Sequence, residues 1–209
     1  MFAVANGPGS FTGIRVGVAA AQAWAQAFSK PVVGISVLGA MIETARPEDE
    51  VALAFMDARR GELFAGVSRV LPGTRRTDNP TYELSQELLL KREAVAHFIS
   101  ELSILGPVTC VIRDNDPWVD DLRAAVGERL IQDFPGARDE GTRSRSPLGV
   151  EGGMPPTDRL IRWHSIRGTL VAAIARIALQ AHREGRLQRP EELDAGYIRR
   201  SDAEMHWYE

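Results

Sequence analysis

The first 45 residues alternate between strand-like and helical patterns, and this alternation constrains the fold more than any other feature. Apolar strand-like stretches at 2–6 (FAVAN) and 31–36 (PVVGIS) are each followed by a segment of helical character. The first helix is predicted over 11–29, because this stretch is rich in alanine and ends before a proline. The second runs from a Ser36 cap to about Thr44. Strand–helix–strand–helix order favours a parallel or mixed sheet covered by helices, so we predict an α/β fold.

A polar, proline-bearing break at 45–50 separates this region from the next and is a candidate domain boundary. Beyond it the pattern predicts a hairpin of two strands and a helix opened by a Ser85 cap. The stretch at 135–156 is rich in Gly, Pro, Ser and Arg and predicts a long mobile loop. The predicted elements of this region are strands at 51–58 and 61–70, a helix at 85–102, a strand at 108–112, a helix at 117–126, a strand at 128–134 and a helix at 166–185 closed by Gly185.

The composition argues against several classes of function. A formal net charge of -3 at pH 7 disfavours independent, electrostatically driven binding of nucleic acid. No apolar run has the length needed to cross a bilayer, and the N-terminus shows no signal-peptide pattern. The single Cys110 excludes a disulfide within one chain, and the four histidines show no metal-ligand spacing. We therefore expect a cytoplasmic protein without membrane contact, metal or cofactor.

The glycine-rich stretch GPGSFTG between the first strand and the first helix has the position of a phosphate-binding loop. A P-loop requires a Lys–Ser/Thr pair at the helix start, and no lysine is present there. A dinucleotide fingerprint requires a third glycine, where this chain has Thr12. Two interpretations remain: a tight turn with Ser10 as the helix cap, or a weak anion site on free backbone N–H groups. The residues concerned are Gly7, Gly9, Ser10 and Thr12.

One face of the first predicted helix carries very small side chains. Gly13, Gly17 and Ala21 recur every four residues, with Ala20 beside them. Each helical glycine costs about 0.5–1 kcal/mol relative to alanine, and close approach of another backbone is the usual compensation. That neighbour is either the chain's own sheet or a helix of a second protein, and spacing alone does not separate the two. In the second case Arg15 and Trp24 would supply a polar and an aromatic anchor.

Asp57 is the one carboxylate with an obvious position near a strand end. We interpret Asp57, Arg59 and Gly61 as a structural turn, in which the carboxylate accepts a hydrogen bond from the backbone N–H of Arg59 or Arg60. The alternative is a magnesium ligand of a phosphotransferase, which would require further carboxylates and glycine loops.

Three stretches of the chain together resemble the TsaB (YeaZ) family. They are GPGSFTGIRVGVAAAQAWAQAFSKPVVGISVL, DARRGELF (57–64) and DAGYIRR (194–200), although Ala195 stands where the family has proline. The resemblance implies two actin-like α/β domains of the acetate kinase/Hsp70 type. The first would comprise 1–46 and 166–209, and the second 47–165. Family members carry further strands before the glycine-rich stretch, so the first domain is expected to be incomplete at its N-terminus.

The resemblance also implies a function. TsaB proteins are non-catalytic subunits that bind the catalytic subunit TsaD and, with the ATPase TsaE, place threonylcarbamoyl on the adenosine beside the tRNA anticodon. On this basis the helix at 11–29 binds TsaD, or a second copy of this chain, and tRNA is reached only indirectly. The partner-binding residues would be Gly13, Arg15, Gly17, Ala20, Ala21 and Trp24, with no catalytic residue. The alternative is an enzyme of the same fold, either an M22-type peptidase or a phosphotransferase.

Overall fold

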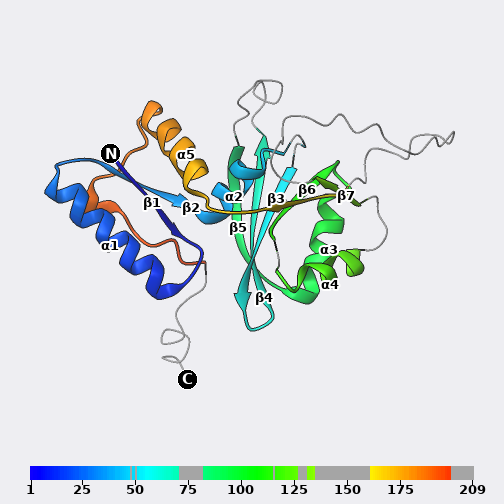
Figure 1. Cartoon of the computed structure of the whole chain (residues 1–209). Coiled ribbons are helices and arrows are strands. Elements are labelled where there is room, and N and C mark those ends of the chain that lie inside the picture. Colours follow the sequence, from blue (N-terminus) through cyan, green and yellow to red (C-terminus); the bar gives the residue numbers. More distant parts are fainter. Residues whose placement is uncertain are drawn as a thin grey trace.

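The described residues form two β-sheets with helices on their faces (Figure 1). The structure is a computed structural model, and it describes residues 1–47, 49, 51–70, 82–114, 116–126, 131–134 and 161–198. The predicted loop at 135–156 therefore lies outside the described residues.

The N-terminal unit is a β–α–β element followed directly by a second helix. Strands β1 (Phe2–Gly7) and β2 (Val32–Ser36) pair in parallel, and α1 (Phe11–Ala27) connects them. Helix α2 (Val37–Ala45) begins straight after β2, because the Ser36 hydroxyl caps it by accepting a hydrogen bond from the Gly39 N–H at 3.1 Å. These four elements confirm the predicted order.

The second sheet has six strands in the order β5-β4-β3-β6-β8-β7. Its first three strands in sequence form an antiparallel meander, and the first two of them are the predicted hairpin. The remaining strands run parallel to β3 and to one another. The strands are β3 (Val51–Arg59), β4 (Glu62–Val70), β5 (Tyr82–Lys91), β6 (Val108–Arg113), β7 (Ile131–Phe134) and β8 (Ile161–Ile166).

Each face of the six-stranded sheet buries its own hydrophobic core. Helices α3 (Arg92–Leu102) and α4 (Val119–Val126) cover one face, where Phe55, Trp118 and Trp163 are almost fully buried. The other face packs against α2, and residues of α5 (Val171–Arg183) belong to the same core. Helix α2 contacts strands of both sheets and lies between them, whereas α5 packs on α2, β1 and β2 (Figure 1). The assignment of this helix to a first domain remains a prediction, since one core joins α5, α2 and the six-stranded sheet.

Two of the predicted boundaries are wrong. The segment predicted as a helix over 85–102 is strand β5 up to Lys91, because its backbone pairs along the whole length of β4. The Ser85 hydroxyl donates to the Val67 carbonyl oxygen at 3.1 Å and caps no helix. The helix predicted from Ile166 begins at Val171, and Ile166 ends strand β8, which pairs with β6.

Strand β8 carries one titratable side chain that makes stability depend on pH. His164 is half-buried, and this burial lowers the pKa of its imidazole. The native state therefore binds fewer protons than the unfolded state, so stability falls as the pH drops below the ordinary histidine pKa of about 6.5. We expect His164→Gln to reduce the loss of unfolding free energy between pH 7.5 and 5.0, measured by urea denaturation. His97→Gln, at an exposed site on α3, is the control, and an equal effect of both variants would contradict this assignment.

Candidate functional site

Helix α1 buries one stripe and exposes an apolar outer face. Its buried side chains are Ile14, Val18, Ala21 and Ala25, which pack on β1 and β2. A surface helix ordinarily carries charged residues on its outer side. Arg15 is the only charged residue in the 17 residues of α1. The exposed residues on its outer side are mostly small or apolar, with Gln26 as an uncharged polar residue among them: Thr12, Val16, Ala19, Ala23, Gln26, Ala27 and, just after the helix, Phe28.

The structure corrects the prediction that the small residues Gly13, Gly17, Ala20 and Ala21 form the accessible face of α1. Ala21 is 5% exposed and packs in the chain's own core, so it offers no surface to a partner. Gly17 is half-buried against β1, where an added Cβ would lie 3.6 Å from the Val4 side chain. Ala20 is also half-buried, and Gly13 is exposed. The accessible face is therefore centred on Val16, Ala19 and Ala23. The sequence prediction did not include these residues, although the near absence of charged residues from α1 is a signal for an apolar outer face.

The two predicted anchors lie on opposite sides of the helix. Arg15 and Trp24 are nine residues apart, which is two and a half turns. Trp24 is 57% exposed, and its ring centroid lies 6.2 Å from that of Phe2 on β1. Phe28 is 64% exposed and also contacts Phe2. The aromatic side chains of Trp24, Phe28 and Phe2 thus border the outer face on one side, and Arg15 borders it on the other. The two predicted anchors are therefore not neighbours.

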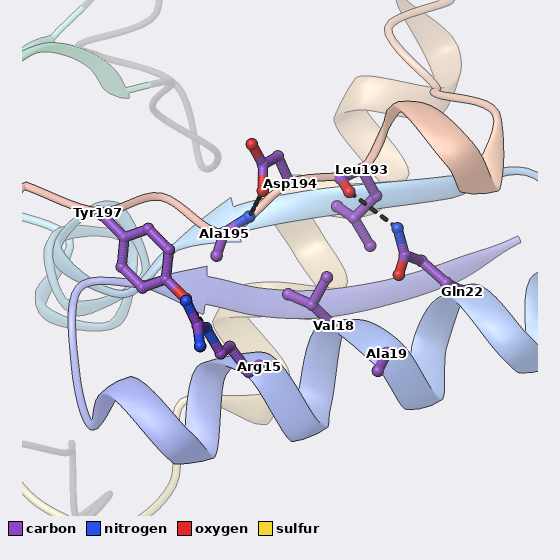
Figure 2. Close-up of a pocket in the computed structure, with 8 residues that line it drawn as sticks. All are labelled: Arg15, Val18, Ala19, Gln22, Leu193, Asp194, Ala195 and Tyr197. Carbon is purple, nitrogen blue, oxygen red and sulfur yellow. Dashed lines mark hydrogen bonds between the residues drawn. The ribbon is translucent and has the colours of Figure 1, made fainter. Parts of the chain in front are cut away.

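An open pocket of about 270 Å³ lies beside Arg15, between α1 and the segment 193–197 (Figure 2). Gln22 donates from Nε2 to the carbonyl oxygens of Pro190 and Leu193 at 3.0 and 2.9 Å, which fixes this segment against the helix. Arg15 donates from Nε to the Tyr197 hydroxyl at 2.9 Å. The pocket is lined by Arg15, Val18, Ala19, Gln22, Leu193, Asp194, Ala195 and Tyr197.

The glycine-rich loop contacts the same C-terminal segment. Gly7 has φ +139°, and a Cβ there would lie 2.3 Å from the Gly196 carbonyl oxygen. The Gly196 N–H donates to the Asn6 carbonyl oxygen at 2.7 Å. Ser10 caps α1 by accepting from the Gly13 N–H at 3.4 Å, and Gly9 and Thr12 are exposed. The need for glycine at position 7 is thus explained by the chain's own packing.

The turn between β3 and β4 has the hydrogen bond that its residues predict. Asp57 Oδ1 accepts from the Arg59 N–H at 2.9 Å, and a nitrogen of Arg92 lies 3.7 Å from the same oxygen. Arg59 and Gly61 both have positive φ. Burial, and next the Asp57 carboxylate, raise the pKa of Asp116 nearby. Within the described ranges no group of three His, Cys, Asp or Glu residues could hold a metal ion.

The chain is similar to several known proteins. A family model described as TsaD, tRNA N6-adenosine threonylcarbamoyltransferase, matches residues 1–95. A Bacillus subtilis (strain 168) protein named tRNA threonylcarbamoyladenosine biosynthesis protein TsaB is 38% identical over 64 residues, which is 31% of this chain and 28% of that protein. The Escherichia coli (strain K12) protein of the same name is 41% identical over 64 residues, 30% of this chain and 28% of that protein. The sequence match thus spans little more than a quarter of these relatives.

Solved structures extend the likeness of fold over most of the chain. A structure titled YeaZ from Pseudomonas aeruginosa superposes with a TM-score of 0.58 and 19% identity, covering 93% of this chain and 71% of that one. A second structure, titled as an uncharacterized protein with similarity to peptidase YEAZ from the same organism, has the same TM-score and identity, with 94% and 72% covered. Among the described residues, no helix is long and apolar enough to span a membrane.

Proposed function

We propose that this chain, which resembles the TsaB (YeaZ) family in sequence and in fold, is a non-catalytic subunit in the biosynthesis of tRNA threonylcarbamoyladenosine. It acts by binding a TsaD-type catalytic subunit, and it meets the TsaE-type ATPase and tRNA only through that assembly. The observation that carries this proposal is the outer face of α1, which is exposed, mostly apolar and free of charge except at Arg15.

Several properties of α1 fit a helix–helix interface. Small side chains at Ala19, Ala23 and Ala27 allow a second helix to approach closely. Large exposed side chains at Trp24 and Phe28 supply the aromatic anchors in which interfaces are enriched. The helix lies at one edge of the molecule, opposite α3 and α4 (Figure 1). Because the model that matches 1–95 bears the name of TsaD, a protein related to this region is a suitable partner, as is a second copy of this chain.

We also infer that the two sheets belong to two actin-like domains, 1–46 with 166–209 and 47–165. The packing of α5 on α2, β1 and β2 supports the return of the chain to the first domain. The likeness to YeaZ structures over most of the chain supports the same arrangement.

The test is the binding of the TsaD-type subunit from the same organism, measured by calorimetry on wild type and on Ala23→Arg. Ala23 is exposed at the centre of the outer face, and arginine has nearly the helix propensity of alanine, so folding should be unchanged. We expect binding to weaken by roughly 30-fold or more, because a bulky charge would be buried in an apolar contact. Ala175→Arg, at an exposed position of α5, should bind as wild type does.

Two results would contradict the proposal. The first is the absence of binding by the wild-type protein. The second is equal binding by wild type and Ala23→Arg, which would place the interface away from the outer face of α1.

A further inference from the structure

The guanidinium of Arg15 is held in one orientation by its own chain. Its Nε donates to the Tyr197 hydroxyl at 2.9 Å, and its Cζ lies 3.9 Å from the centre of the Phe11 ring. The Tyr197 ring packs against the Phe11 ring at 5.1 Å between centroids. Contacts of this kind reduce the rotamer freedom that a surface arginine otherwise loses on binding.

The two terminal nitrogens of Arg15 make no hydrogen bond within the described part of the chain. The guanidinium remains exposed, beside a pocket whose walls come from α1 and the segment 193–197 (Figure 2). A fixed guanidinium with a free edge matches the geometry of a carboxylate, which can accept two parallel N–H bonds. The pocket volume of about 270 Å³ suits the side chain of one residue better than a large ligand.

We propose that Arg15 binds an aspartate or glutamate side chain of the protein partner in this pocket, with Tyr197 as the positioning residue. This inference rests on the proposed function, because the carboxylate is supplied by the TsaD-type subunit. The outer face of α1 forms the apolar centre of the interface, and Arg15 forms a charged contact at its rim. Such a contact contributes specificity of orientation as well as affinity.

A phosphate group of RNA is less well matched to this site. Arg15 is the only cationic residue among those that line the pocket. Binding of a nucleic-acid backbone usually requires several cations on one surface. A single guanidinium facing one carboxylate is the simpler complement.

The experiment titrates the TsaD-type subunit into wild type, Arg15→Gln, Arg15→Lys and Tyr197→Phe at 50 and 300 mM NaCl, with thermal unfolding of each protein. We expect roughly 10-fold weaker binding for Arg15→Gln and about 5-fold for Arg15→Lys, which keeps the charge but loses the planar fork. Tyr197→Phe keeps the charge and loses the orienting hydrogen bond, so about 3-fold is expected. The affinity of Arg15→Gln should depend less on salt than that of wild type.

Arg183→Gln removes the same charge from an exposed site on α5 and should leave binding unchanged. If Arg15→Gln binds as wild type does, the inference is wrong and Arg15 only holds the segment 193–197. If Arg15→Gln loses binding of the cognate tRNA and keeps binding of the subunit, the ligand is RNA and the inference is again wrong. Loss of binding in Ala23→Arg alone would leave the proposed function standing without this contact, whereas a wild type that does not bind overturns both.

Discussion

Gly7→Ala is expected to lower the free energy of unfolding by about 2–4 kcal/mol, more than any other change in the glycine-rich loop. Two effects add at this position. Alanine at φ +139° is strained, and its Cβ would lie 2.3 Å from the Gly196 carbonyl oxygen. Relief of that overlap displaces the segment whose Gly196 N–H donates to the Asn6 carbonyl oxygen. Urea denaturation at pH 7.5 measures the effect.

Gly9→Ala is the matched control two residues further along the loop. A Cβ at Gly9 would meet the Ile14 side chain at 3.8 Å, an ordinary contact. Gly9→Ala should raise the free energy of unfolding by no more than about 0.5–1 kcal/mol, because alanine chiefly reduces the conformational freedom of the unfolded chain. Equal destabilisation by Gly7→Ala and Gly9→Ala would contradict the explanation by packing against Gly196. It would indicate instead that both glycines have the same role in the loop.

The second large effect is expected at Asp49, whose buried carboxylate joins two neighbouring strands. Thr109 on β6 donates to Asp49 Oδ2 at 2.6 Å, and Arg162 on β8 pairs with Oδ1. Thr109 and Arg162 are directly opposite in the parallel register. Asp49→Ala should cost about 3–5 kcal/mol in unfolding free energy, because it leaves a partly buried guanidinium and a buried hydroxyl without their acceptor.

A second substitution, at Arg162, tests whether the loss comes from the unpaired guanidinium. Asp49→Ala combined with Arg162→Met removes both members of the ion pair and should recover a large part of the loss. If the double variant is as unstable as the sum of the single ones, the two side chains do not interact. Chemical denaturation of all four proteins completes the cycle.

The sequence predicted the elements whose patterns are local. The order of β1, α1, β2 and α2 and the Ser36 cap follow from apolar runs and capping residues in the first 45 positions. The part of β5 from Ser85 onward was predicted as helix, because Leu88 and Leu89 fit a helical stripe that continues into α3. Pairing with β4 decides that this segment is a strand, and such a tertiary contact cannot be deduced from the periodicity of the sequence.

The candidate site was predicted in part. The choice of α1 as the candidate interface follows from its composition, but which of its faces points outward depends on which side packs on β1 and β2. Periodicity alone fitted two stripes, and the structure buries Ile14 and Val18 together with Ala21, whereas Gly13 is exposed. The contact between Arg15 and Tyr197 spans 182 residues of sequence, and no spacing rule brings two such distant residues together.

The segment 188–197 has a consequence for the order of folding during protein synthesis. It pairs with β2 through Gln188 and Val32, holds α1 through Gln22, and meets β1 through Asn6, whose amide donates to a carbonyl oxygen 188 residues away. A ribosome adds about 5–20 residues per second, so β1 waits roughly 10–40 s after its own synthesis for its contacts with 188–197. The unit of β1, α1 and β2 is thus completed only after 188–197 has been made. Substitutions in 188–197 will therefore act as folding defects of β1 and β2 and will raise their need for chaperones.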